Sequence, residues 1–178
     1  DFVAYEQLEN GEFEAMDKKL LILPQSVAMS RKEAEAVRRF AENGGVVVAD
    51  CRIALMDNHC KMLSEGQLDE LFGIRRASML PSPGVPGLKP VASIPREYEW
   101  AKPLVSVGEL ENIAVAEPDI SPANGAFALF SDNAGAPAVI VRNCGRGKTI
   151  YLNMYLTDYH RWRLKKGEGS GARKLMSR

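Results

Sequence analysis

Two short apolar runs with an amphipathic segment between them form the clearest pattern in the chain. Residues 19–24 and 45–50 each contain four consecutive apolar side chains, as strands buried on both faces of a parallel sheet do. Between these runs, apolar positions three and four residues apart predict a helix that begins at a capping box formed by Ser30 and Glu33. The sequence Asn43-Gly44-Gly45 would end that helix. Strand, helix and strand in about 30 residues predict a βαβ unit.

The pattern changes on both sides of this unit. Residues 2–5 are expected to form an earlier strand, and a short helix closed by Gly73 is predicted over 65–73. Six prolines interrupt every period between about 79 and 103, which predicts a long irregular connection. Three later segments, separated by turn sequences, predict an antiparallel meander: 126–130, 136–141 and 148–153.

These elements predict an α/β fold of the flavodoxin-like, three-layer type, with a parallel sheet and an antiparallel C-terminal extension. Because a doubly wound sheet normally begins with a further strand and helix, we expect about 50 residues of the parent fold to precede Asp1. The expected domain is 1–160. Residues 161–178 form a basic tail with seven Lys or Arg against one acid.

Composition excludes several classes of function. The charges of the 23 basic and 23 acidic residues cancel, so the chain has no overall positive field and no nucleic-acid binding is predicted. Apolar runs of this length are far below the roughly 18 residues that cross a bilayer, so no membrane span is predicted. Three cysteines without a Cys-x-x-Cys pair predict no disulfide framework, and slightly favour a reducing compartment such as the cytoplasm.

The loop after residues 45–50 holds the candidate site, because open α/β sheets place their sites at the carboxyl ends of strands. Cys51 is a possible nucleophile, with His59 as its base. Nucleophile elbows need very small residues two positions before and after the nucleophile, which Ala49 satisfies and Ile53 does not. The acidic, His and Cys residues of this loop match no zinc spacing, so we expect no metal and no cofactor.

A ligand-binding role suits this loop better than turnover. Its candidate binding residues are an arginine, two carboxylates and a titratable imidazole: Arg52, Asp50, Asp57 and His59. The structural alternative is that Asp50 and Arg52 pin the loop through a mutual pair or through neighbouring backbone, with Asp57 accepting from a backbone amide or from His59.

Two other motifs have simpler interpretations. Residues 145–149, Gly-Arg-Gly-Lys-Thr, end like a phosphate-binding loop, but Arg142 occupies the position of the first glycine, so a hairpin turn is favoured. The aromatic and polar residues of 97–100 and 159–162 resemble sugar-stacking surfaces, although such clusters are more often ordinary core edges or interfaces.

Residues 5–11, 20–30 and 40–50 resemble the β-galactosidase trimerisation domain, and Asp50-x-Arg52, Asp57-x-His59 and two later runs, 68–74 and 145–153, are similar to it as well. That family is a glutamine-amidotransferase-like module found after the catalytic barrel of β-galactosidase-like glycoside hydrolases. The resemblance implies a glutamine-amidotransferase-like fold that serves as a non-catalytic accessory or oligomerisation domain. Its implied partners are further copies of the chain, other domains of the parent chain and carbohydrate.

The alternative function is a Cys-dependent hydrolase or amidotransferase that uses Cys51. True amidotransferases of this kind place their Cys in a Gly-x-Cys-x-Gly elbow and follow a late strand with His-x-Glu. Here both glycines are absent, and Met154-Tyr155-Leu156 follows the corresponding strand. The usual triad therefore cannot assemble, which favours the accessory role.

Overall fold

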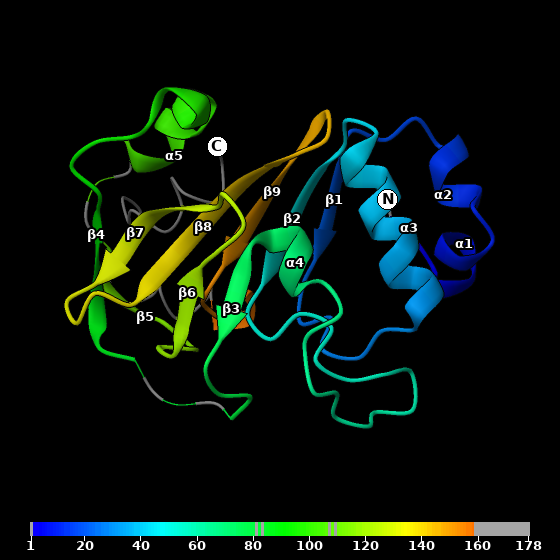
Figure 1. Cartoon of the computed structure of the whole chain (residues 1–178), viewed down its shortest axis with the longest axis horizontal. Coiled ribbons are helices and arrows are strands. Elements are labelled where there is room, and N and C mark those ends of the chain that lie inside the picture. The colour runs from blue at the N-terminus through cyan, green and yellow to red at the C-terminus, as the bar shows by residue number, and fades with distance from the viewer. Residues whose placement is uncertain (1, 81, 83, 107, 109, 159–178) are drawn as a thin grey trace.

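A mixed seven-stranded sheet organises the chain in the computed structural model, which describes residues 2–158 except 81, 83, 107 and 109 (Figure 1). The strand order is β1-β2-β9-β8-β7-β4-β5. In that order the strands are Leu20–Leu23, Val46–Asp50, Gly147–Leu152, Pro137–Cys144, Phe127–Asp132, Pro86–Pro90 and Leu110–Ala114. The first three pair in parallel and the others antiparallel. The observed class is therefore α/β with a mixed sheet.

The predicted βαβ unit is confirmed. Helix α3 (Arg31–Glu42) begins where the Ser30 hydroxyl accepts from the amide of Glu33, while the Glu33 carboxylate accepts from the amide of Ser30. Both ends of the capping box are thus satisfied. One face of the helix, including Val37 and Ala41, is fully buried. Residues 45–50 form β2, which lies between β1 and β9 and is not an edge strand.

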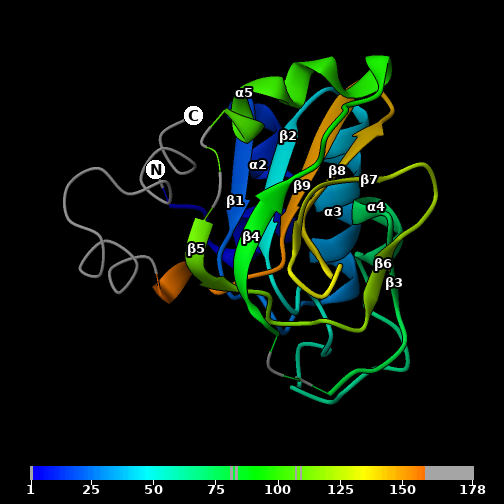
Figure 2. The ribbon, with the colours of Figure 1, turned by 90° about the vertical axis from the view of Figure 1, so that its left-hand side faces the viewer.

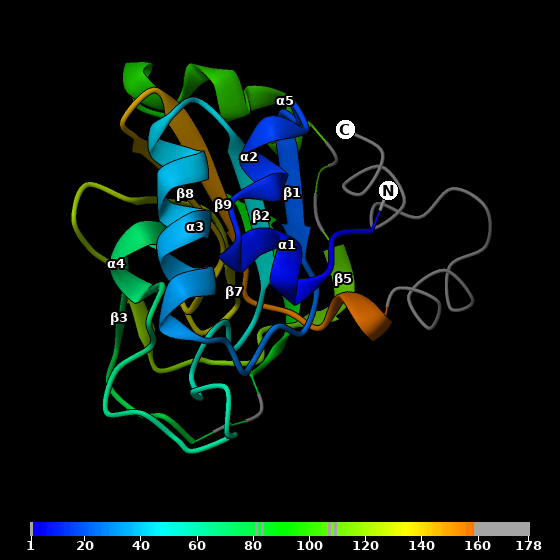
Figure 3. The ribbon, with the colours of Figure 1, turned by 90° about the vertical axis from the view of Figure 1, so that its right-hand side faces the viewer.

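The N-terminal segment corrects one prediction. Residues 2–5 form no strand: residues 2–4 have no regular structure, and Tyr5 begins α1 (Tyr5–Glu9). Helix α2 (Glu12–Ala15) follows after Gly11, whose φ is +76°. Figure 3 shows α1, α2 and α3 gathered on one side of the sheet beside β1. The apolar side chains of this segment, such as Leu8, pack into the core from a helix instead of a strand.

The proline-rich region also corrects a prediction. Pro86 and Pro90 bound β4, which pairs with both β5 and β7. The same region continues into a 3-10 helix η1 (Arg96–Ala101) and α5 (Lys102–Val105), at the top of the view in Figure 2. Residues 79–103 are therefore not an irregular connection throughout. Helix α4 (Asp69–Phe72) is shorter than predicted. Two further elements were not predicted: a second sheet in which β3 (Ile74–Arg76) pairs with β6 (Ile120–Pro122), and a final 3-10 helix, η2 (Leu156–Asp158).

The antiparallel meander is confirmed as β7-β8-β9, and its last strand also joins the parallel part of the sheet. Residues 145–149 are a hairpin turn and the start of β9, with Gly145 at φ +56°. Adjacent residues of the central strands face two different cores, since Val47 packs in the core under α3 and Val48 against the core that contains Tyr98 and Ala101. No helix in the part of the chain that the structure describes is long and apolar enough to cross a membrane.

Candidate functional site at the carboxyl ends of β2 and β9

Asp50 is the last residue of β2, and its side chain is completely buried. Its Oδ1 accepts from the amide of Gln25 at 2.6 Å, and its Oδ2 accepts from the amide of Leu156 at 3.3 Å. Burial raises the pKa of this carboxyl group, and the two amides oppose that effect. Asp50 therefore joins β2 to the loop after β1 and to the segment after β9, a structural use of the carboxylate.

Cys51 follows as a small buried thiol, 1% exposed. Burial raises its pKa well above the ordinary value, and the neighbouring carboxylates of Asp50 and Glu117 raise it further. A nucleophilic cysteine needs the opposite environment, one that stabilises its thiolate. His59, the only histidine within the described residues, lies on an exposed turn, while the other, His160, lies outside them.

Arg52 takes the strained position in this turn, with φ +64°. Its amide donates to Glu117 Oε2 at 2.9 Å and to the Tyr151 hydroxyl at 3.1 Å. Its guanidinium donates to the carbonyl of Met79 at 3.3 Å. The amide that a strand-to-helix elbow would present to a reacting oxygen is thus occupied by a carboxylate of the same chain.

Four side chains complete a polar cluster that sequence reasoning did not identify: Arg76, Asp69, Glu117 and Tyr151. Arg76 Nε donates to both carboxylate oxygens of Asp69 at 3.0 Å each, and Arg76 Nη1 pairs with Glu117 Oε1. The Tyr151 hydroxyl donates to Glu117 Oε2. The side chains of Arg76 and Glu117 are 3% and 5% exposed, so this ion pair is deep inside the protein.

Asn153 fixes the backbone of Glu117, one residue of the cluster, through hydrogen bonds. Its amide group donates to the carbonyls of Glu117 and Pro137 at 2.9 and 2.8 Å, and its Oδ1 accepts from the amide of Glu117 at 2.9 Å. Burial raises the pKa values of Asp69 and Tyr151, while Arg76 opposes both shifts. Every charged group here has a partner from the same chain, which is what a structural cluster requires.

Asp57 and His59 lie at the surface and are not brought to the cluster. Asp57 Oδ1 accepts from the amides of His59 and Lys61 at 2.9 and 3.0 Å, which closes the exposed turn. The backbone bond from Lys61 lowers the pKa of Asp57, assisted by the bond from His59. The four candidate binding residues therefore divide into buried Asp50, half-buried Arg52 and Asp57, and exposed His59. Among the described residues no group of three or more potential metal ligands forms.

The buried carboxyl of Asp50 should make the stability of the folded protein depend on pH in a testable way. Because burial raises its pKa in the folded state, the folded protein binds this proton more tightly than the unfolded chain does. The stability that Asp50 contributes is therefore present below the unfolded pKa and is lost as pH rises through the folded pKa. We expect the stability of wild type relative to Asp50→Asn to increase as pH falls from neutral towards about 4, the ordinary pKa of an aspartate.

Urea unfolding of both proteins at each pH measures this difference, in which the other titrating groups cancel. Asp57→Asn is the matched control, because the pKa of Asp57 is lowered and its pH trend has the opposite sign. A constant difference between wild type and Asp50→Asn across this range would contradict the expectation.

The fold is that of a mixed-sheet α/β domain, in which the thiol of Cys51 is buried and the amide of Arg52 is bonded to Glu117. A family model described as the β-galactosidase trimerisation domain matches residues 12–167, and the chain belongs to that family. It is thus related to a non-catalytic module of glycoside hydrolases. Among curated proteins, none matches the sequence.

Solved structures share this fold at low sequence identity. The β-galactosidase from Bacillus circulans sp. alkalophilus is 15% identical, with a TM-score of 0.59 over 89% of this chain and 22% of that one. The β-galactosidase from Rahnella sp. R3 is 20% identical, with a TM-score of 0.55 over 83% and 22%. The exo-β-1,4-mannosidase Op5Man5 from Opitutaceae bacterium strain TAV5 is 16% identical, with a TM-score of 0.52 over 89% and 24%. The chain spans less than a quarter of each enzyme.

Proposed function

We propose that the chain is the assembly module of a larger glycoside hydrolase, in which it holds subunits or domains together and performs no chemistry itself. The family match over residues 12–167 carries this proposal. The buried thiol of Cys51 and the closed cluster around Glu117 support it, since neither offers a reactive group to a substrate. That the parent catalyses glycoside hydrolysis is inferred by analogy with the glycosidases named above.

We also propose the finer fold assignment, a three-layer domain related to flavodoxin-like and glutamine-amidotransferase-like proteins. The parallel strands β1, β2 and β9 support it, as does the placement of α3 over one core and η1 over the other. The hairpin strands β7, β8 and β9 would then be the antiparallel extension of an originally parallel sheet. By this assignment the turn after β2 corresponds to the nucleophile turn of the catalytic relatives.

Sedimentation of the complete parent protein tests the assembly role. We expect removal of the segment corresponding to residues 1–160 to convert an oligomer into smaller species, because the contacts that join the subunits would be lost. Circular dichroism and the melting temperature of the remaining protein serve as controls for folding. An unchanged oligomeric state in a folded deletion variant would count against the proposal.

Alkylation of the three cysteines separates this function from the Cys-dependent alternative. Cys60 is exposed, whereas Cys51 and Cys144 are buried and have raised pKa values. We expect iodoacetamide at about pH 7 to modify Cys60 at least about tenfold faster than Cys51, as peptide mass spectrometry would show. In denaturant all three should react at similar rates. Faster modification of Cys51 than of Cys60 would favour an enzyme.

Binding of a small polar ligand at the loop over 50–60 remains a prediction. Both oxygens of Asp50 are already used by backbone amides, so such a ligand would meet Arg52, Asp57 and His59 first. Carbohydrate is the ligand that the parent's proposed chemistry favours. A shift of the NMR signals of the His59 ring on addition of galactose or mannose would show such binding directly.

A further inference from the structure

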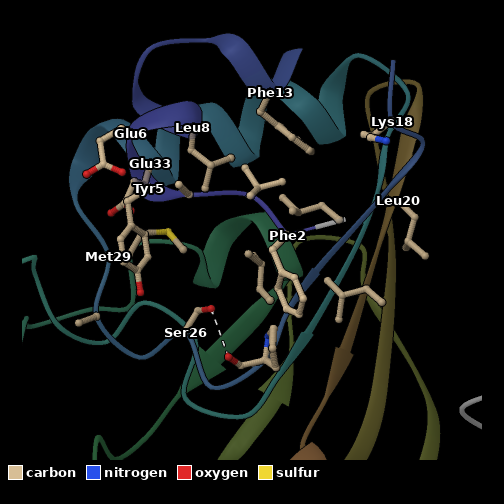
Figure 4. Close-up of a pocket in the computed structure, with 17 residues that line it drawn as sticks. Phe2, Tyr5, Glu6, Leu8, Phe13, Lys18, Leu20, Ser26, Met29 and Glu33 are labelled. Carbon is tan, nitrogen blue, oxygen red and sulfur yellow. Dashed lines mark hydrogen bonds between the residues drawn. The ribbon is translucent and has the colours of Figure 1, made fainter. Parts of the chain in front are cut away.

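Two cavities in the structure differ in the chemistry of their walls. One, of about 830 Å³, lies beside β1 and residues 2–6, and its walls include the buried side chains of Leu8, Phe13 and Leu21 (Figure 4). These side chains belong to the core under α3, so this cavity continues the hydrophobic core. The other, of about 700 Å³, is lined mainly by polar and charged residues. The second cavity therefore offers hydrogen bonds to a polar ligand.

The polar cavity lies where α3, α4 and β3 come together. α4 lies between α3 and β3 (Figure 1), and the loop over 64–67 also lines the cavity. Arg38 from α3, Glu70 from α4 and Arg75 from β3 contribute to its walls, together with Ser78 beyond β3. Its volume is within the range of about 300 to 1,000 Å³ that small-molecule sites occupy. None of the residues that line it comes from the loop over 50–60, so it is a different place from the candidate site there.

Hydrogen bonds within the chain fix part of the cavity wall. The carboxylate of Asp69 accepts from Arg76 Nε at 3.0 Å and from the amide of Gly66 at 3.2 Å. The guanidinium of Arg38 donates to the carbonyl of Gln67 in the same loop. These bonds connect α3, the loop over 64–67, α4 and β3. A wall that is already in place loses little conformational entropy when a ligand binds.

Four exposed residues of the cavity have polar side chains that are free to bind a ligand. The side chains of Ser64, Glu65, Glu70 and Arg75 make no hydrogen bond or ion pair with any other residue that the structure describes. The two carboxylates are balanced in charge by the guanidiniums of Arg75 and Arg38. The cavity thus presents both donors and acceptors while these four charges cancel.

A neutral ligand rich in hydroxyl groups matches this lining better than other classes of ligand. Each hydroxyl group both donates and accepts, so it can bond to a guanidinium or to a carboxylate. An anion would also approach the two carboxylates, and a cation would also approach the two guanidiniums. An apolar ligand would remove these charged groups from water without replacing their hydrogen bonds.

We propose that the cavity at α3, α4 and β3 binds a neutral monosaccharide or disaccharide. The class of ligand follows from the lining, whereas the choice of galactose or mannose units rests on the proposed function. None of the residues described as lining the cavity is aromatic, so the sugar is held mainly by hydrogen bonds and not by stacking on a ring. We therefore expect weak binding, with a Kd on the order of 1 mM.

Amide NMR of the 178-residue chain, titrated with lactose and with β-1,4-mannobiose, tests the proposal. At least one of the two sugars should cause saturable shifts at the amides of Gly66, Glu70 and Ser78. Galacturonate and glucosamine, which carry a charge, should bind more weakly than the neutral sugar. Glycerol at the same concentration of hydroxyl groups is the control for solvent effects. Shifts that do not saturate, or that glycerol reproduces, would overturn the proposal.

Glu70→Ala and Arg75→Ala test the two recognition groups. Neither side chain has a partner within the described part of the chain, so both variants should fold like wild type, which circular dichroism checks. We expect each substitution to weaken sugar binding by about three- to tenfold, the loss of one hydrogen bond. Glu35→Ala is the matched control, because Glu35 is an exposed carboxylate of α3 that does not line the cavity. Equal affinities in all three variants would refute the assignment.

Two other occupants are distinguished by the same measurements. Sugar-induced shifts confined to His59 and its neighbours would overturn the proposal in favour of the loop over 50–60. Cavity amides that ignore sugar, and become protected from hydrogen exchange only when the parent protein assembles, would overturn it in favour of a protein interface.

The fate of the assembly role is a separate outcome. If the proposed function fails, sedimentation of the parent does not change on deletion of the segment, yet the titration can still saturate at Gly66 and Ser78. If only the sugar proposal fails, the oligomer depends on the segment while these amides show no response to sugar.

Discussion

Replacing Arg76 by Ala is expected to lower the free energy of unfolding by about 3 to 5 kcal/mol. The side chain of Arg76 is 3% exposed and pairs with the carboxylates of Asp69 and Glu117. Its removal leaves both anions close together in a region of low effective dielectric, with no cation to offset their desolvation. The neighbouring Arg75→Ala is the matched control, since Arg75 is exposed and should cost less than about 0.5 kcal/mol.

Acid should partly rescue the Arg76→Ala variant. Without the guanidinium, protonation of Asp69, whose pKa burial already raises, relieves its repulsion with Glu117, so the deficit relative to wild type should shrink as pH falls. The double variant Arg76→Met with Glu117→Gln should lose less than the sum of the single losses, because it removes both members of the buried pair. Urea unfolding of the two single variants and of the double variant measures these losses, and additive losses would show that the pair is not coupled.

The sequence predicts the β1-α3-β2 unit because its signals are local. Ser30 and Glu33 reach each other within one helical turn, and the apolar runs of β1 and β2 need no distant information to be recognised. The meander at β7, β8 and β9 is predicted for the same reason, since turn residues separate its strands.

β4 could not be predicted this way. Its residues Pro86-Gly87-Leu88-Lys89-Pro90 contain two prolines and a glycine, and only Leu88 is buried. The strand exists because β5 and β7 flank it and supply its hydrogen bonds. Tertiary pairing overrides the local preference of these residues. Pro86 and Pro90 stand at the ends of the strand, where the lost backbone donor does least harm.

The polar cluster shows the same limit for the candidate site. Arg76 and Glu117 lie 41 positions apart, and no spacing rule joins them. The single available signal was the acid in the otherwise apolar stretch Val115-Ala116-Glu117, since a buried carboxylate needs a cation. The loop at Asp50 and Arg52 was predicted by its place after a strand, but the partners of its groups depend on segments from distant parts of the chain.

A substitution at Gly147, in the hairpin at residues 145–149, should have the second large effect on stability. Gly147 begins β9 where the chain passes close to the end of α3, and a Cβ there would lie 2.1 Å from the carbonyl oxygen of Ala41 and 2.2 Å from that of Gly45. Both atoms belong to backbone, which cannot move aside as a flexible side chain can. We expect Gly147→Ala to lower the free energy of unfolding by about 3 kcal/mol, the upper end of the usual range for overpacking.

Gly125→Ala is the matched control for that substitution. Gly125 also lies in a turn before a strand, with φ +77°, but a Cβ at this position meets nothing within 4 Å. Its cost should be the backbone strain alone, about 1 kcal/mol. Chemical denaturation of both variants compares the two. Equal losses in the two variants would contradict a packing role for Gly147 at the end of α3.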